Sequence, residues 1–501
     1  MGKSPYLCSR KMKTTCKMSE MKHKMMAAVV GLAMAQTAAA QWNTDSTEWN
    51  SYDRWRLGGY GEMVAAFKNY KTDRMRNAGF GATHENRNTI AIPRFVIAGD
   101  YKFSKHWNLG VEVEFEAGGT GTAIEIEEGE NQFEYETEVE KGGEVALEQF
   151  HITYHLNQFF NVRAGHMIVP VGLTNTHHEP VNFFGTVRPE GESSLIPNTW
   201  HETGIAFFGQ FGRRWASFDW EAQLVGGLNV NGFQRKTWVA DGKQGLFEVD
   251  NFTSPAYVVR LNYRGIPGLR LGASVYYCND CTRNADASKT ANYTFSAPLV
   301  IWSVDAQYRN RWVVARANVL RGHLDNSYKV GVANNKLGKG TPYSRKTPVG
   351  EVAVSYGGEA GLRIKGFVRN PKMPDITPFV RYEYYNPQEK VEAPELADPR
   401  FRVSMWTAGI NYKPLPFLVV KADYTTRSIG GGDYNSENEF ALGVAFTGWF
   451  FGDKASQARW AAHKAKRAAK REAAEKAVIE DMNRRLEQQQ KELDALKAKI
   501  M

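Results

Sequence analysis

The feature that most constrains this chain is a repeated alternation of apolar and polar residues, broken by connections that are in turn short and long. Alternation with a period of two is typical of β-strands. Sixteen stretches carry it, at residues 54–68, 89–103, 107–117, 144–156, 160–169, 200–211, 215–230, 256–264, 269–278, 297–309, 311–322, 352–364, 376–386, 401–412, 417–427 and 438–451.

The connections indicate how these strands are arranged. Every second one is short, as at 104–106 and 157–159, except for the one at 365–375, and the intervening ones are mostly long. Short turns at one end and long loops at the other are the signature of a bacterial outer-membrane barrel, whose closed sheet leaves no unpaired edge in hydrocarbon. We therefore predict an all-β fold, a 16-stranded antiparallel transmembrane β-barrel over residues 54–451, with both termini in the periplasm.

The aromatic content fits this prediction. The chain has 22 Tyr, 13 Trp and 27 Phe, and after residue 40 it has no apolar run long enough for a spanning helix. A barrel of sixteen strands is too wide for side chains to fill, so we expect a water-filled interior.

The N-terminal region resembles a secretory signal peptide. Two lysines precede an apolar core at 25–35, and small residues at 38 and 40 form a cleavage site. Residues 1–20 are polar and precede a second start at Met21, which indicates a misassigned start codon. The alternative is a short anchor helix. We expect a signal peptide at 1–40 and a periplasmic segment at 41–53.

The basic charge lies at the two ends of the chain. Residues 1–40 and 454–501 each carry a net charge of +6, which leaves residues 41–453 at −3 out of a total of +9. This distribution does not favour a nucleic-acid binder.

Two cysteines remain after signal cleavage, Cys278 and Cys281. A structural zinc site of cysteines would need four thiols. A local disulfide that ties a loop is the favoured interpretation in an oxidising compartment, and a free redox pair is the alternative.

Part of the chain resembles a known family. The stretch GHMIVPVG at 165–172 and the segment at 174–209 are similar to the phosphate-selective porin O/P family, in particular to its Bacteroidetes-type members. The resemblance covers about 54–451. It implies a sixteen-stranded barrel, a homotrimer, and a third long loop that folds into the lumen and narrows it.

The charges of that loop differ from the family pattern, in which basic residues select phosphate. Loop 170–199 has one basic residue, Arg188, and the loop before it has nine Glu and one Lys between 125 and 144. This acidic stretch reads as a hairpin above the membrane, with divalent cation binding as the alternative. The residues expected at the constriction are His177, His178, Glu179, Arg188, Glu190 and Glu192.

The pair His177 and His178 has three interpretations. Neighbouring histidines in an extended chain point apart, so they rarely share one metal ion. Pore lining or loop hydrogen bonding is favoured, a surface role is second, and a metal cluster completed by His201 and Glu202 is third. We predict no metal site and no cofactor.

Charged residues recur on one face of the strands, and we expect them in the lumen. They are Arg94, Glu112, Glu114, Arg260, Asp305, Arg316, Arg363, Arg381, Glu383, Lys421 and Asp423. Facing rows of opposite charge create a transverse field that sorts solutes by charge. The alternative is a solvated wall without preference.

Residues 452–501 are rich in Ala, Lys, Arg and Glu, which favours a periplasmic helix. Between 479 and 500 the apolar residues recur in heptads, with a seam of Ile479, Met482, Leu486, Gln489, Leu493, Leu496 and Ile500. We predict a coiled coil that reinforces the trimer, and we expect the basic stretch 464–471 to attract either peptidoglycan or lipid headgroups. A solvated helix is the alternative.

Together these features predict a porin in the outer membrane of a Gram-negative bacterium, in contact with lipid and lipopolysaccharide. It would pass small hydrophilic solutes or ions by passive diffusion, and no catalytic signature indicates an enzyme. The alternatives are a structural protein that ties the membrane to peptidoglycan, and a surface receptor or adhesin.

Overall fold

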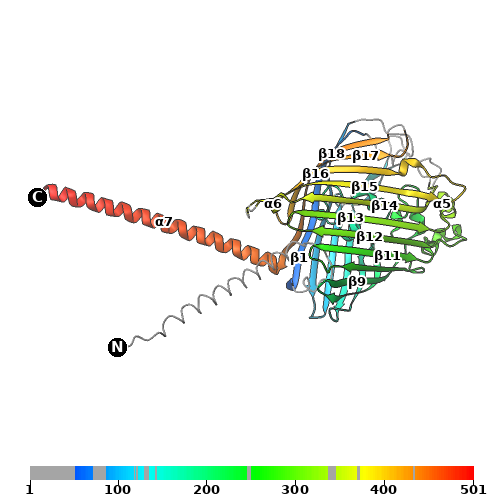
Figure 1. The fold of residues 1–501 in the computed structure, drawn as a ribbon, viewed down its shortest axis with the longest axis horizontal. Helices are drawn as coiled ribbons and strands as arrows, with labels where there is room; N and C mark the ends of the chain where they lie inside the picture. Colours follow the sequence, from blue (N-terminus) through cyan, green and yellow to red (C-terminus); the bar gives the residue numbers. More distant parts are fainter. Residues whose placement is uncertain are drawn as a thin grey trace, which may run out of the picture.

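Sixteen strands close into one antiparallel barrel in this computed structural model, as the sequence predicts (Figure 1). The structure describes residues 51–70, 86–117, 119, 122–128, 135–141, 144–244, 250–336, 346–368, 370, 373–432 and 435–500. The predicted signal peptide lies outside the described residues. The strands are β1 (Tyr52–Lys68), β2 (Arg87–Lys102), β3 (Trp107–Glu116), β6 (Glu144–His155), β7 (Asn161–Ile168), β8 (His201–Arg213), β9 (Ala216–Val225), β10 (Ala256–Tyr263), β11 (Leu269–Cys278), β12 (Leu299–Arg309), β13 (Val313–Leu324), β14 (Gly350–Leu362), β15 (Asp375–Val391), β16 (Val403–Leu415), β17 (Leu418–Ile429) and β18 (Ser436–Asp453).

The barrel closes where its first and last strands meet. β1 pairs with β18 on one side and with β2 on the other, so the sheet has no free edge. The residues that flank the barrel are also joined, since Lys454 forms an ion pair of 2.8 Å with Asp53.

The two faces of the wall have opposite character. In β10, Val259 and Leu261 are exposed on the outside, whereas Arg260 between them is buried on the inside. In β16, Trp406 and Ile410 point outward in the same way and Thr407 points inward. This arrangement is the reverse of that in a soluble barrel, which would put its apolar residues inside.

Helices and a hairpin extend the two ends of the barrel. β4 (Thr122–Glu128) and β5 (Tyr135–Lys141) pair with each other outside the barrel, as expected for the acidic stretch. The long-loop end carries α5 (Ser327–Asn335), and the opposite end carries α6 (Ile364–Phe367) (Figure 1). No helix in the described residues is long and apolar enough to cross a membrane.

A single long helix, α7 (Lys454–Ile500), continues directly from β18 and runs away from the barrel (Figure 1). It leaves from the short-turn end. The predicted tail is therefore helical. Its seam residues Ile479, Met482 and Leu486 are more than half exposed in the single chain, and the coiled coil stays a prediction.

The loops at the long-loop end pack into an apolar cluster over β8 to β14, which contains Trp200, Trp238 and both cysteines. The predicted disulfide is not formed in the structure, because Cys278 and Cys281 are free, buried thiols. The loop is tied by other means. The thiol of Cys278 contacts the carbonyl of Ser254 at 3.6 Å, and the carboxylate of Asp280 accepts hydrogen bonds from the backbone N–H groups of two loop residues.

Candidate functional site

The segment 169–200, which joins β7 to β8, lies inside the barrel. It contains two short helices, α3 (Leu173–Thr176) and α4 (Glu190–Ser193). Its residues contact inward-facing side chains of β2, β6, β10 to β15 and β17, as the contacts of Arg94, Glu148, Arg260 and Lys421 show. Because these strands lie on different sides of one closed barrel, a segment that touches all of them must lie within it.

Charged side chains of the wall satisfy the backbone of this segment. The ammonium group of Lys421 donates hydrogen bonds to the carbonyls of Pro180, Phe183 and Gly185, the last two at 2.9 and 2.7 Å. Asp423 accepts from the N–H of Thr186 at 2.5 Å. An irregular segment has few backbone partners of its own, so these wall charges replace the hydrogen bonds that it lacks.

The predicted lumen charges therefore mostly hold protein groups. Arg316 and Arg363 are half-buried, and the buried ones are Arg94, Glu112, Glu114, Arg260, Asp305, Arg381, Glu383, Lys421 and Asp423. Arg260 pairs with Asp305 at 2.6 Å, and Glu383 accepts from the N–H of Gly191 at 3.1 Å. Arg363 pairs with Asp375.

His177 faces a group of arginines. Its Nδ1 lies 3.1 Å from the carbonyl oxygen of Leu173, and its Nε2 contacts Arg270 of β11 and Gln307 of β12. Burial, followed by the charges of Arg270 and Arg260, holds the pKa of His177 well below its usual value. The ring is therefore neutral at physiological pH.

His178 faces a different wall. Its Nε2 lies 2.9 Å from Oε1 of Glu148 on β6, and its ring makes an edge contact with Tyr60 of β1. Burial opposes the charged ring, but the nearby Glu148 carboxylate outweighs it and raises the pKa of His178. The two adjacent rings thus point to different walls.

The other residues that the sequence predicts at the constriction bind groups within the segment or on the wall. Glu179 is buried and accepts a hydrogen bond of 2.5 Å from the side chain of Asn182. Arg188 donates to Thr199 at 3.2 Å, and burial together with Arg94 lowers its pKa to about 10. Neither side chain extends freely into the lumen.

Both glutamates of α4 bind groups outside this helix. Glu190 binds Arg427 of β17 and the hydroxyl of Tyr385 of β15, each at 2.6 Å. Glu192 accepts hydrogen bonds from the N–H groups of Leu173 and Asn175 at 2.9 and 2.7 Å, although burial raises its pKa to about 7. α4 is therefore joined both to the wall and to α3.

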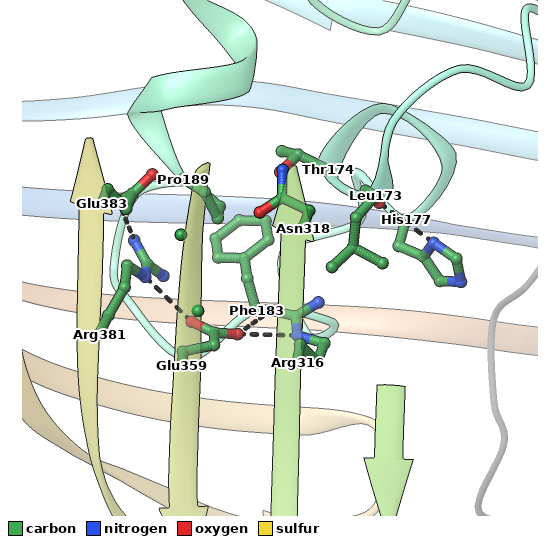
Figure 2. Close-up of a pocket in the computed structure, with 12 residues that line it drawn as sticks. Leu173, Thr174, His177, Phe183, Pro189, Arg316, Asn318, Glu359, Arg381 and Glu383 are labelled. Carbon is green, nitrogen blue, oxygen red and sulfur yellow. Dashed lines mark hydrogen bonds and ion pairs between the residues drawn. The ribbon is translucent and has the colours of Figure 1, made fainter. Parts of the chain in front are cut away.

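A small cavity of about 20 Å³ remains between the segment and β13 to β15, with room for roughly one water molecule (Figure 2). Glu359 lies between Arg316 and Arg381 at its edge. We call four inward-facing arginines of β10, β11, β13 and β15, which are Arg260, Arg270, Arg316 and Arg381, the basic wall. Four inward-facing glutamates of β1, β3 and β6, which are Glu62, Glu112, Glu114 and Glu148, form the acidic wall.

Two important wall residues were not predicted from the sequence. Glu359 lies four residues before Arg363, and residues an even number of positions apart in a strand face the same side. The alternation would therefore have placed Glu359 on the inner face together with Arg363. Glu148 breaks the period, because by alternation it belongs on the outer face beside Phe150. The adjacent polar residues Glu148 and Gln149 were the available sign of an irregular strand.

The similarities that this chain shows to the following proteins are distant. No family model matches it. An uncharacterized protein of Aquifex aeolicus (strain VF5) is 24% identical over 384 residues, which are 74% of this chain and 79% of that protein.

Several solved structures have a similar course of the chain. The anion-selective porin from Comamonas acidovorans is 10% identical, with a TM-score of 0.45 over 79% of this chain and 99% of that one. The outer membrane channel DcaP of Acinetobacter baumannii is 11% identical, with a TM-score of 0.45 over 79% and 97%. OmpF of Salmonella typhi is 12% identical, with a TM-score of 0.47 over 80% and 99%. At these values the architecture rests on the strand pairing described above.

Proposed function

We propose that this protein is an outer-membrane porin, through which small hydrophilic solutes or ions diffuse passively past the segment 169–200. The observation that carries this proposal is the closed barrel with an apolar outer face and a charged inner face. Such a wall suits lipid outside and water inside.

The inner segment supports a narrowed channel. Charged side chains from many strands bind it, and these contacts support a position across the lumen rather than at its mouth. The basic wall and the acidic wall lie on different sides of it, which sets up a transverse field. A solute that passes must orient its own charges in that field, and selectivity between ions would follow from this. Phosphate is one solute to test among other small anions.

The same proposal places the chain in the outer membrane of a Gram-negative bacterium, surrounded by lipid and lipopolysaccharide, as a homotrimer. The helix α7 leaves from the short-turn end, which outer-membrane barrels direct to the periplasm. Three parallel tails would bury Ile479 and Leu486, which are exposed in one chain. The basic stretch 464–471 would then lie near peptidoglycan.

Recording from planar lipid bilayers tests this function. The purified, folded protein should produce discrete current steps whose size increases with salt concentration. If folded protein inserts and no current flows, the porin proposal is wrong. Binding of the same protein to isolated peptidoglycan would then favour the structural tether, for which the long basic helix is the specific observation.

A further inference from the structure

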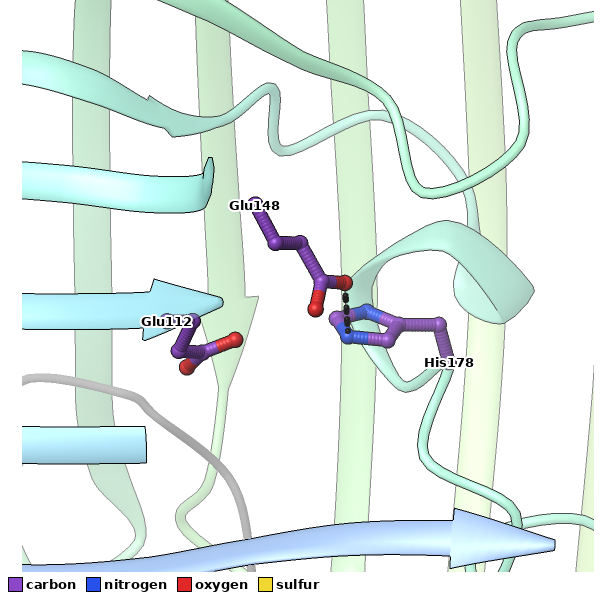
Figure 3. Close-up of side chains that lie close together, drawn as sticks. All are labelled: Glu112, Glu148 and His178. Atoms are coloured by element: carbon purple, nitrogen blue, oxygen red, sulfur yellow. Dashed lines mark ion pairs between the residues drawn. The ribbon is translucent and has the colours of Figure 1, made fainter. Parts of the chain in front are cut away.

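Three side chains from separate parts of the chain meet on the acidic wall. Glu112 of β3, Glu148 of β6 and His178 of the inner segment each offer one ligand atom, and these atoms lie within 4.8 Å of one another (Figure 3). Their exposed fractions are 1%, 0% and 3%. The group therefore lies in the interior, where an unbalanced charge is costly.

A β-bulge brings the second carboxylate to this position. Glu112 pairs with Gln149, and the next residue, Val113, pairs with Leu147, so Glu148 has no partner across the ladder. A bulge inserts one residue and redirects its side chain. Glu148 consequently turns inward beside Gln149, although the alternation of β6 would have placed it outside.

The imidazole of His178 is oriented for ligation. Its Nδ1 lies 3.0 Å from the carbonyl oxygen of Asn175, so Nδ1 carries a proton and donates it to that carbonyl. Nε2 then has a free lone pair in the neutral ring. It lies 2.9 Å from Glu148, yet it makes no hydrogen bond of acceptable geometry within the described residues. A lone pair this close to a carboxylate requires a proton or a metal ion to balance it.

The two carboxylates have neutral neighbours and no ion pair with Lys or Arg in the described residues. The hydroxyl of Tyr60 contacts both oxygens of Glu148, at 2.9 and 2.7 Å. Both oxygens of Glu112 are buried and neither forms a well-shaped hydrogen bond in the described part of the chain, although Gln149 is its ladder neighbour. Arg94 pairs with Glu62 and lies 4.0 Å from Glu114. Among the described residues, neither Glu112 nor Glu148 forms an ion pair with Lys or Arg.

We propose that Glu112, Glu148 and His178 bind a divalent first-row transition-metal ion such as Zn²⁺, and that the ion links the inner segment to the acidic wall. One imidazole nitrogen with two carboxylate oxygens suits such ions, whereas Mg²⁺ and Ca²⁺ prefer oxygen alone. Ligand atoms about 2.1 Å from a tetrahedral ion lie about 3.4 Å apart, so ligand atoms that are as much as 4.8 Å apart approach by up to about 1.4 Å through rotation of the two Glu side chains. The site does not depend on the proposed transport function.

Metal binding to the untagged, chelator-treated full-length protein tests this site. Titration calorimetry should show one saturable Zn²⁺ site per chain. Glu112→Gln keeps the shape of the side chain and removes a ligand. Because loss of even an outer partner costs 10–100-fold, this variant should bind at least about a hundredfold more weakly. Tyr60→Phe removes only the outer partner of Glu148 and should weaken binding about tenfold.

Glu114→Gln is the matched control, with the same change of charge on the same face of the same strand but outside the three ligands. It should weaken binding by less than about tenfold. Equal losses in Glu112→Gln and Glu114→Gln would reveal a diffuse acidic patch and overturn the proposal, as would the absence of a saturable site in the wild type. Heat-dependent gel migration shows that each variant is folded.

A spectroscopic probe identifies the histidine independently. Cu²⁺ bound to the wild type should show magnetic coupling to an imidazole nitrogen, and His178→Asn should lose that coupling. Coupling that persists in His178→Asn would assign the ion to another histidine and contradict the site.

Discussion

His177 and His178 are neighbours in the chain and face opposite electrostatic surroundings. Arginines of the basic wall surround His177, whereas Glu148 of the acidic wall approaches His178. Both rings are buried, so burial alone would lower both pKa values. The pKa of His177 is lowered and that of His178 is raised, and the wall that each ring faces decides the direction. The contrast shows that the lumen is divided by charge on the scale of one residue.

The largest expected effect comes from removing hydrogen bonds that hold the segment 169–200, which contains both His177 and His178. In Lys421→Met, three backbone carbonyls lose their donor, which should cost about 3 kcal/mol or more of local stability. The segment should loosen, and open-channel current noise should rise. Lys413→Met is the control, because Lys413 contacts one carbonyl at 3.5 Å. Equal noise in both variants would contradict the role of Lys421.

Single substitutions of the charged partners should reduce the difference in pKa between His177 and His178. Arg270→Gln should raise the pKa of His177, and Glu148→Gln should lower that of His178, as measured by NMR titration of the metal-free protein. The charge of Arg270 lowers the pKa of His177 in the same direction as burial, whereas Glu148 raises the pKa of His178 against burial. Changes of the same sign in the two variants would show that burial, rather than the walls, sets the difference.

The same pKa directions set the pH dependence of stability. The pKa of His178 is raised, so its contribution is complete below the ordinary value of 6.5 and is lost as pH rises through the raised value. The pKa of His177 is lowered, so its neutral ring costs stability as pH falls below 6.5. Glu192 of the same segment, whose pKa is raised to about 7, also loses stability as pH rises from its ordinary value, so each histidine is tested by comparison with a variant. In metal-free protein, the loss of protease resistance of the segment below pH 6.5 should be smaller in His177→Asn than in the wild type, and the loss above pH 6.5 should be smaller in His178→Asn. Losses equal to those of the wild type in both variants would contradict the assignment.

Charge selectivity tests whether the basic wall and the acidic wall influence passing ions in opposite directions. Glu62→Gln removes the carboxylate that pairs with Arg94 in the acidic wall, and Arg316→Gln removes positive charge from the basic wall. Reversal potentials in a salt gradient should shift toward anions in the first variant and toward cations in the second. Shifts in one common direction would mean that only one wall borders the path of the ions.

The smallest effect is expected far from both walls, in α7. Leu486→Asp should lower the melting temperature of the trimer by a few degrees, because three heptads add modestly to a trimer that the barrels already hold. Barrel insertion should be unchanged. If the trimer melts as the wild type does, α7 is a solvated helix.

The sequence predicts the barrel well because its signals are local. A period of two and the loop lengths sufficed to find all sixteen strands, and the composition of residues 452–501 sufficed to find the tail helix. It does not reveal Glu148, whose direction depends on a bulge set by pairing with another strand. The partners of the inner segment are also hidden, because Lys421 reaches Gly185 across more than two hundred residues. Contacts of this kind depend on closure of the barrel and carry no local pattern.

The unit conductance of a single channel tests the central claim, that the inner segment limits flow through the barrel. Residues 177–192 can be replaced by a short glycine–serine link, and the variant compared with the wild type in one salt solution after its folding has been checked. We expect this variant to have a clearly larger conductance and weaker ion selectivity, because the anchored backbone and both histidines are removed together. An unchanged conductance in the folded variant would contradict it.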